Sequence, residues 1–343
     1  MAIPNKTITM PNPTVLITDY AWPDLDRERS ILAPLNAHLL VAERGDEAEL
    51  IGLAPQATAI LTCWQKVTPA VLDAAPNCIH VSRYGVGLDN IAVEHATALG
   101  IVVTNVPDFC VEEVSDHAMA LILACARRVV GFDRAVRAGT WNNTSLGPLP
   151  RLRGQTLGLV GFGNSARALL PKAKGFGMRV IAYTPRLSPT ALQAPDVATN
   201  DLAFLLRESD YISLHAPLTP ETQHLINAET LRHMKPSAFI INTARGALID
   251  EAALASALHE GSITGAALDV LSQEPPPTDH PLLRMDNVIV TPHAAFYSSA
   301  AIAELAEKAA RHVAQSLQGQ QPDHIVNPAV LTQANLRLTR QGA

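Results

Sequence analysis

Basic runs, long apolar stretches and a leader-like start are all missing from this sequence. No block of lysine or arginine stands out and the formal net charge is -6, so nucleic acid and anionic membranes are poor candidate partners. No uninterrupted apolar run approaches the roughly 20 residues that a membrane span needs. Residues 1–15 are polar and proline-rich, unlike a signal peptide. These absences predict a cytoplasmic protein that binds neither nucleic acid nor membrane.

Cysteine and charge are also scarce. The four cysteines, Cys63, Cys78, Cys110 and Cys125, show no C-x-x-C spacing, so we expect reduced, buried thiols and no metal site. Charged residues make up 17% of the chain and hydrophobic residues 48%, which is a globular and not a disordered composition. A chain of 343 residues exceeds one ordinary hydrophobic core, so we expect two domains.

Short β-branched runs alternate with longer amphipathic or alanine-rich segments along the chain, which is typical of parallel α/β sheets. A first series fills the first third, with helical stretches such as 68–75 and 90–99 between its strands. Its five expected strands are 15–18, 39–41, 59–62, 79–83 and 101–104.

A second series follows a long helical pattern over 111–128 and a loop rich in glycine and proline. Its six expected strands are 156–160, 179–183, 211–214, 239–242, 265–270 and 288–291. The sequence therefore predicts an α/β fold of two doubly wound parallel sheets, a flavodoxin-like domain and a Rossmann dinucleotide-binding domain. The pattern leaves open which domain the helical stretch 300–318 packs against.

A glycine-rich turn follows the first strand of the second series. It reads Gly161-Phe162-Gly163-Asn164-Ser165-Ala166, the G-x-G-x-x-A form of the dinucleotide fingerprint. Gly161 would make the tight turn, Gly163 would let the backbone approach a pyrophosphate, and Ala166 would let the helix lie close to its strand. Because a strand precedes the turn and a helix follows it, we expect a dinucleotide site here and not a merely structural βα turn.

The position that separates NAD from NADP departs from the NAD pattern. An Asp or Glu normally ends the second strand and accepts a hydrogen bond from the ribose 2′-hydroxyl, but this chain has Thr184, followed by Pro185 and Arg186. No carboxylate would repel a 2′-phosphate, and Arg186 could pair with one, unless it is simply an exposed loop residue. The sequence favours NADP(H) and leaves NAD(H) open.

Three polar residues follow neighbouring strands of the second series: Arg245, Glu274 and His293. Reduction of a keto acid needs a cation for the carboxylate and keto oxygen, and the planar fork of arginine suits both. It also needs a proton donor that titrates near neutrality, for which histidine is suited, and a carboxylate that orients and charges that histidine. Each residue alone also fits a cap, turn or loop role. Together, at the same sheet edge, they predict a catalytic set.

The first domain offers a second glycine-rich turn, Arg83 to Asn90, after its fourth strand. Backbone N–H groups there could bind a substrate carboxylate, although a tight structural turn is the alternative. If the turn binds substrate, the substrate lies between the domains and binding closes them.

At these residues the sequence resembles the D-isomer-specific 2-hydroxyacid dehydrogenases, from about residue 79 to residue 326. Matching stretches are RYGVGLDNI, VTNVPDFCVEEVSDHAMALIL, TLGLVGFGNSARAL, SLHAPLTPETQHLIN, MKPSAFIINTARGALIDEAAL, GAALDVLSQEPPP and NVIVTPHAAFYS. The VPDFC, QEPPP and TPHAAFYS forms are most similar to the branch of C-terminal-binding proteins.

The resemblance implies an NAD(P)-dependent oxidoreductase that transfers a hydride to a 2-keto acid to give a D-2-hydroxy acid, with Arg245, Glu274 and His293 as its catalytic set. It implies that Asp269 orients the nicotinamide carboxamide. It also implies homodimers and a split substrate-binding domain, 1–105 with 297–343, around a dinucleotide-binding domain, 106–296. Further cofactor contacts that the resemblance implies are His215, Thr243 and Ala244. The fingerprint turn and the end of the second strand add Asn164, Ser165, Thr184 and Arg186 as expected cofactor contacts. The expected substrate contacts are Arg83, Tyr84, Val86, Gly87, Arg245 and Phe296.

Several departures from the family pattern bear on specificity. Asn164 stands where the family usually has an arginine near the pyrophosphate, and Phe296 stands where the corepressor branch has tryptophan. The smaller ring would enlarge a wall of the pocket and suit a bulkier or differently shaped keto acid. Because the directions of the pocket side chains cannot be read from a sequence, glyoxylate, hydroxypyruvate and branched or aromatic keto acids all remain open. Two other interpretations stay open as well: a dinucleotide-sensing scaffold with little turnover, and related chemistry on formate or phosphite.

Overall fold

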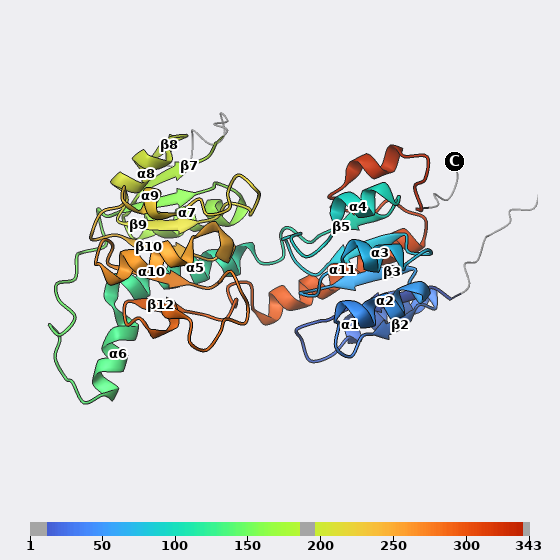
Figure 1. Cartoon of the computed structure of the whole chain (residues 1–343), viewed down its shortest axis with the longest axis horizontal. Coiled ribbons are helices and arrows are strands. Elements are labelled where there is room, and N and C mark those ends of the chain that lie inside the picture. Colours follow the sequence, from blue (N-terminus) through green and yellow to red (C-terminus); the bar gives the residue numbers. More distant parts are fainter. Residues whose placement is uncertain (1–11, 186–195, 339–343) are drawn as a thin grey trace, which may run out of the picture. The chain divides into compact units, whose positions relative to one another are not determined.

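Two parallel sheets, each with its own core, form the protein. The computed structural model describes residues 12–185 and 196–338. The chain divides into unit 1, Met1–Phe109 with Ser298–Ala343, and unit 2, Cys110–Tyr297. Figure 1 labels the elements of both units.

Unit 1 is built on a five-stranded parallel sheet of order β2-β1-β3-β4-β5. This is the flavodoxin-like order, in which the chain reverses direction across the sheet after β2. The expected strands are all present, with ends shifted by a residue or so. The strands are β1 (Thr14–Ile17), β2 (His38–Val41), β3 (Ala59–Thr62), β4 (His80–Arg83) and β5 (Val102–Thr104).

Helix α11 (Ser299–Leu317) belongs to unit 1, although it lies near the end of the chain. It packs against α1 (Asp26–Leu32) and β4. Ser298 begins the helix by accepting a hydrogen bond from the Ala301 N–H at 2.9 Å. The placement resolves the ambiguity that the sequence pattern left. The other helices of unit 1 are α2 (Glu47–Leu53), α3 (Pro69–Asp73) and α4 (Val93–Ala98).

Unit 2 contains a seven-stranded parallel sheet of order β12-β11-β10-β9-β6-β7-β8. The expected strand count of six was wrong, because the three-residue β8 (Val197–Thr199) pairs with β7 at one edge. So short a run carries no readable apolar pattern. The other strands are β6 (Thr156–Val160), β7 (Arg179–Tyr183), β9 (Tyr211–Leu214), β10 (Phe239–Asn242), β11 (Gly265–Leu268) and β12 (Val288–Val290).

Both faces of this sheet are covered by helices, as parallel sheets require. Alternate strand residues enter two different cores: Ile240 packs in one core with residues of α8 (Leu202–Glu208), α9 (Ala228–Leu231) and α10 (Glu251–His259). Ile241 packs in the other core with residues of α5 (Val111–Arg127) and α7 (Asn164–Gly175). Because helices cover both faces, a ligand meets this sheet at the ends of its strands.

Helix α6 (Val129–Arg137) was not expected, since the sequence pattern predicted one helix and then a loop. Arg128 separates it from α5 by taking a left-handed conformation, φ 49°. Among the residues described, no helix combines the length and apolar character that a bilayer crossing requires. The four cysteines are buried and form no disulfide.

The core of unit 1 contains two histidines that are held neutral. His80 on β4 is 0% exposed, and burial, with a smaller effect of His312, lowers its pKa to about 3. His312 on α11 is 3% exposed, and burial followed by the charge of His324 lowers its pKa to about 4. Both rings are neutral in the fold but take up a proton near pH 6.5 when unfolded. Their contribution is therefore present above that pH and lost as the pH falls from 6.5 towards 4.

We expect unit 1 to lose stability on acidification by up to about 1.4 kcal/mol per pH unit for each of these histidines. Tryptophan fluorescence during urea unfolding at pH 7.5 and 5.0 measures this, because Trp22 and Trp64 lie in unit 1 while Trp141 is already 89% exposed. His312→Leu should flatten the pH dependence, and His259→Leu, at an exposed helix position, should not. Equal slopes for all three proteins would contradict this account.

Candidate active site

Polar residues of unit 2 gather at the carboxyl edge of its sheet. In an open α/β sheet, ligands bind at this edge beside the point where the strand order reverses, which here lies between β6 and β9. Segments that leave the strands at this edge carry Gly161, Thr184, His215, Thr243 and Asp269.

The glycine-rich turn after β6 has the backbone that a phosphate needs. Gly161 has φ 92°, and a Cβ there would lie 2.7 Å from the Ala216 backbone nitrogen, so only glycine fits. At Gly163 a Cβ would meet nothing within 4 Å, which leaves the backbone open to a ligand. Buried Ala166 (0% exposed) packs α7 against the sheet. The turn has the geometry of a dinucleotide loop.

The N-terminus of α7 begins without a side-chain cap at Gly163. In the described parts of the chain, no hydrogen bond satisfies the backbone N–H groups of Asn164, Ser165 or Ala166. Uncapped N–H groups and the positive end of the helix dipole together favour an anion. The loop therefore fits the pyrophosphate of a dinucleotide.

Three further cofactor candidates directly follow the strands β10, β9 and β7 at this edge. Thr243 is 9% exposed and its Oγ1 is buried without a hydrogen-bond partner among the described residues, as expected of a group that binds a ligand. His215 lies 2.9 Å from Ser213 Oγ through Nε2, and burial lowers its pKa to about 4, so the ring is neutral near pH 7. Thr184 directly follows β7, where the ribose partner is expected. Arg186 lies outside the described residues.

Arg245 is held by the turn that follows β10. Fully buried Asn242 accepts from the Ala244 N–H at 3.0 Å and donates to the Arg245 carbonyl at 2.8 Å. A Cβ at Gly246 would overlap the peptide between Leu271 and Ser272. Gly246 thus lets the Arg245 turn lie directly against the loop that carries Glu274.

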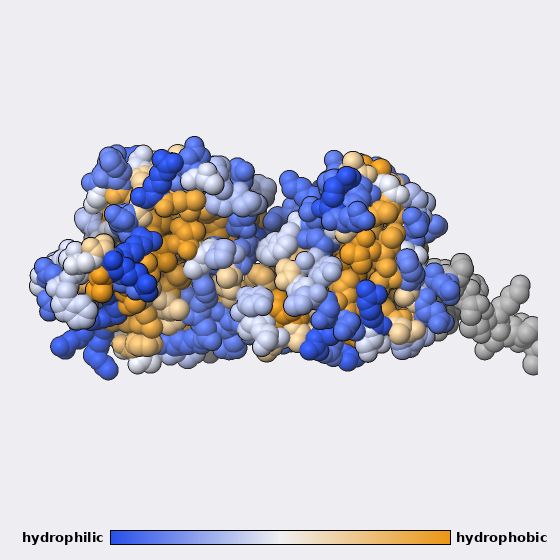
Figure 2. Space-filling view, turned by 90° about the horizontal axis from the view of Figure 1, so that it is seen from below, coloured by the Kyte–Doolittle hydropathy of each residue, from blue (hydrophilic) through white to orange (hydrophobic). Residues whose placement is uncertain are grey.

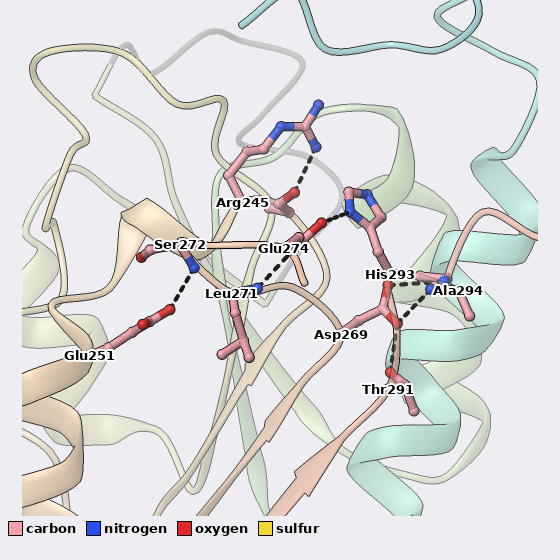
Figure 3. Close-up of polar contacts among 11 residues, drawn as sticks. Arg245, Glu251, Asp269, Leu271, Ser272, Glu274, Thr291, His293 and Ala294 are labelled. Carbon is pink, nitrogen blue, oxygen red and sulfur yellow. Dashed lines mark hydrogen bonds and ion pairs between the residues drawn. The ribbon is translucent and has the colours of Figure 1, made fainter. Parts of the chain in front are cut away.

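Glu274 and His293 form a close pair beside Arg245 (Figure 3). Glu274 Oε2 lies 2.6 Å from His293 Nδ1, and Glu274 Oε1 accepts from the Leu271 N–H at 3.0 Å. Burial opposes ionisation of Glu274, but the hydrogen bond and charge of His293, the Leu271 N–H and the charge of Arg245 outweigh it and lower the pKa of Glu274. The carboxylate therefore stays charged and fixes the orientation of the imidazole.

Two carboxylates, Glu251 and Asp269, anchor the two loops that carry this pair. Glu251 on α10 accepts from the Ser272 N–H at 2.6 Å and lies 3.1 Å from His280 Nε2, which ties down the Glu274 loop (Figure 3). Asp269, 1% exposed, accepts from the Ala294 and Ala295 N–H groups at 2.8 and 2.9 Å. The Asp269 carboxylate is thus engaged with the His293 loop, and its contact with a carboxamide stays a prediction.

Phe296 stands edge-on to the His293 ring, with centroids 6.1 Å apart. The contact of Phe296 with a substrate stays a prediction.

In unit 1, the turn after β4 has the glycine-dependent shape that the sequence suggested. Gly85 has φ 145°, and Arg83 is 6% exposed with Nε donating to Asn90 at 3.0 Å. The Tyr84 side chain is 1% exposed and its hydroxyl donates to Glu28 at 3.0 Å, so a substrate contact by Tyr84 would have to use its backbone. Val86 is 45% exposed and Gly87 half-buried. Substrate binding by this turn stays a prediction.

Gly246, Asn242 and Glu251 support the site although no sequence pattern indicated them. Their roles arise from a close approach of two loops and from hydrogen bonds between separate strands, which no spacing in the sequence reveals.

The sequence of unit 2 matches a known protein family. The sequence profile described as "D-isomer specific 2-hydroxyacid dehydrogenase, NAD binding domain" matches residues 119–295. A glyoxylate reductase of Thermofilum pendens is 43% identical over 270 residues, covering 78% of this chain and 80% of the relative.

Solved structures share the fold of the whole chain. An NADPH-dependent glyoxylate/hydroxypyruvate reductase of Sinorhizobium meliloti, in complex with NADP and malonate, superimposes with TM-score 0.82 at 28% identity, covering 97% of this chain and all of that one (100%). D-lactate dehydrogenase of Aquifex aeolicus, with NAD and lactic acid, gives TM-score 0.81 at 28% identity over 89% of this chain and 96% of its own. The branch of C-terminal-binding proteins stays a prediction.

We expect Gly246→Ala to displace the Arg245 turn, because the added methyl group would overlap the Leu271–Ser272 peptide. Overpacking of this kind costs about 1–3 kcal/mol of stability, and a misplaced guanidinium should lower kcat/KM for a keto acid at least about 10-fold. Gly175→Ala is the matched control, since its Cβ would meet nothing within 4 Å. Thermal melts and steady-state kinetics measure both effects. Equal behaviour of the two variants would contradict the proposed contact.

Proposed function

The chain belongs to the D-isomer specific 2-hydroxyacid dehydrogenase family, and we propose that its substrate is glyoxylate or a similarly small 2-keto acid. Its reaction is the transfer of a hydride between a nicotinamide dinucleotide and a 2-keto acid. The observation that supports this reaction is the Glu274–His293 pair, in which Oε2 and Nδ1 lie 2.6 Å apart beside Arg245 at the carboxyl edge of the sheet.

Glyoxylate is the first candidate because the relative from Thermofilum pendens, aligned over 80% of its own length, is a glyoxylate reductase. The Sinorhizobium meliloti enzyme is a reductase of both glyoxylate and hydroxypyruvate. Hydroxypyruvate is therefore the second substrate to test. For any substrate larger than glyoxylate, whose product glycolate is not chiral, we propose the D product.

Arg245 is proposed to bind the keto acid, and His293 is proposed to protonate it. The guanidinium of Arg245 would pair with the carboxylate and polarise the keto oxygen. Because Glu274 engages His293 Nδ1, the proton would pass from His293 Nε2 to the keto oxygen. When bound, the reduced nicotinamide supplies the hydride to the keto carbon, and Glu274 stabilises the imidazolium before its proton leaves.

The dinucleotide would lie on the Gly161–Gly163 turn, with its pyrophosphate on the N–H groups of Asn164, Ser165 and Ala166. Thr243 Oγ1 would find its missing partner on the cofactor. We propose NADP(H) as the preferred form, since Thr184 replaces the acidic residue that would repel a 2′-phosphate. NAD(H) is the alternative, which titration with both cofactors separates.

A scaffold without turnover is not favoured, because such a protein would not need an ionised carboxylate held against an imidazole beside an arginine. We propose a cytoplasmic location, where buried thiols such as the four of this chain stay reduced.

We also propose that the chain forms a homodimer through α6 and the segment after it. Val129, Val136 and Trp141 are 57%, 46% and 89% exposed. Figure 2 shows further apolar side chains, in orange, gathered on the visible face of unit 2, in the left half of the view. Large exposed apolar patches are typical of protein interfaces.

His293→Ala should lower kcat at least about 100-fold, the usual contribution of a general acid, and leave cofactor binding largely unchanged. His224→Ala is the matched control, because His224 is also a left-handed histidine, φ 51° against 52°, but its side chain is exposed on a different loop. Stopped-flow reduction of glyoxylate and fluorescence titration with the reduced cofactor measure the two quantities. Unchanged turnover in His293→Ala would remove this residue from the mechanism.

Thr184→Asp should weaken NADPH binding at least about 10-fold and leave NADH binding equal or tighter, because the new carboxylate repels a 2′-phosphate and accepts from a 2′-hydroxyl. Thr184→Asn has nearly the same shape without the charge and should change the preference little. Titrations of the three proteins with both reduced cofactors decide the point. Tighter NADH than NADPH binding in the natural chain would refute the proposed preference.

Sedimentation equilibrium should give twice the chain mass. Trp141→Ser with Val136→Ser should shift the protein towards monomer, since both exposed side chains would lose apolar area at the interface. Ile51→Ser, at a position 37% exposed in unit 1, should not. A monomeric natural chain would contradict the proposed dimer.

A further inference from the structure

His117 on α5 contacts the loop that carries His293, and both lie in unit 2. Its Nε2 lies 3.0 Å from Thr291 Oγ1 and 3.5 Å from Asp269 Oδ1. The Asp269 side chain is 0% exposed and that of His117 is 24% exposed. Neither the proposed reaction nor the cofactor loop makes use of His117.

The hydrogens in this cluster can be assigned by counting donors. The Thr291 hydroxyl donates to Asp269 Oδ1 at 2.5 Å, so its single hydrogen is committed to Asp269. Thr291 Oγ1 must therefore accept from His117, which places a hydrogen on Nε2. The contact is directional: His117 donates to Thr291, and Thr291 donates to Asp269.

The loop that carries Thr291 and His293 is short, and its backbone is strained at His293. His293 has φ 52°, a left-handed conformation that costs a residue with a side chain about 1–2 kcal/mol. Its N–H donates to the Asp269 carbonyl at 2.7 Å, while the Asp269 carboxylate accepts from Ala294 and Ala295. Such a conformation persists only where its surroundings over-determine it. Asp269 holds the loop on both sides of His293: its carboxylate accepts from Thr291 before it and from Ala294 and Ala295 after it.

Helix α5 and the His293 loop, which His117 joins, lie at the two points where the chain enters and leaves unit 2. Helix α5 starts at Val111, just after the chain enters unit 2 at Cys110, and the His293 loop ends just before the chain leaves unit 2 at Tyr297. The loop residues Thr291, Ala294 and Ala295 all donate to the Asp269 carboxylate, which lies at the end of β11 and not on α5. His117 therefore adds a link between the loop and the helix with which unit 2 begins.

We propose that His117 is a positioning residue for His293: by donating to Thr291 it fixes the Thr291–Asp269 hydrogen bond and holds the His293 loop to α5. The proposal rests on the proposed function for its kinetic consequence only. Without the His117 donor, Thr291 Oγ1 keeps, among the described residues, only its hydrogen bond to Asp269. The loop can then shift by a fraction of an ångström, which is enough to slow proton transfer from His293.

The test uses the full-length protein and three substitutions. His117→Leu removes the donor, and His117→Gln keeps an N–H donor on a side chain of similar reach. Thr291→Val has nearly the same shape but removes both the acceptor for His117 and the hydroxyl that donates to Asp269. We expect His117→Leu and Thr291→Val each to lower kcat for glyoxylate about 10- to 100-fold, with the KM and the affinity for the reduced cofactor within about 2-fold. His117→Gln should recover most of the lost kcat, and His259→Leu, on the surface of α10, should change nothing.

The double variant His117→Leu/Thr291→Val decides whether the two residues act as one unit. We expect it to be no slower than the worse single variant, since the second substitution removes a bond that is already lost. Multiplying effects, or full turnover in His117→Leu, would overturn the proposal. So would failure of His117→Gln to recover kcat while its melting temperature equals that of the natural chain.

Amide hydrogen exchange of residues 291–297 gives a readout without turnover. We expect faster exchange of the Ala294 and Ala295 amides in His117→Leu and in Thr291→Val, and unchanged exchange in the sheet strands. Unchanged exchange at these two amides would overturn the proposal. If the natural chain reduces no 2-keto acid, the proposed function fails while the exchange result still decides the role of His117.

Discussion

The hydrogen bond between Glu274 Oε2 and His293 Nδ1 spans 2.6 Å, and much of unit 2 is arranged so that it can form. β11 and β12 deliver the two residues on separate loops, and neither loop is fixed by strand pairing once the strands have ended. Gly246 permits the Arg245 turn to lie against the Glu274 loop. The Asp269 carboxylate and carbonyl hold His293 in a conformation that it would not adopt by itself. These contacts therefore fix the orientation of the His293 imidazole.

The charges at the site are arranged so that desolvation does not neutralise them. An ionised carboxylate away from water is costly unless it is paired and hydrogen-bonded. Glu274 meets that condition through His293, Leu271 N–H and Arg245, so its pKa falls in spite of burial. The buried Asp269 side chain accepts hydrogen bonds from one hydroxyl and two N–H groups. In unit 1 burial has the opposite result: it lowers the pKa values of His80 and His312, so both rings are buried in their neutral forms.

The sequence predicted most of the fold because parallel strands buried on both faces are short apolar runs with clear ends. All five strands of unit 1 and six of unit 2 were expected, whereas β8, three residues at a sheet edge, and α6, next to a left-handed Arg128, were not. Motif residues such as Gly161 and His293 could be found because their chemistry demands a residue type at a strand end. Gly246, Asn242 and His117 could not, since each is defined by a neighbour distant in sequence.

The most direct test of the central claim is a crystal structure of the protein with NADP⁺ or NAD⁺ and oxamate, an unreactive analogue of a 2-keto acid. We predict the oxamate carboxylate on the Arg245 guanidinium and its amide carbonyl oxygen within about 3 Å of His293 Nε2, the reach of a general acid. Glu274 should remain on Nδ1. An analogue bound elsewhere, or a His293 ring turned so that Nδ1 faces the ligand and Glu274 has lost its contact, would contradict the account.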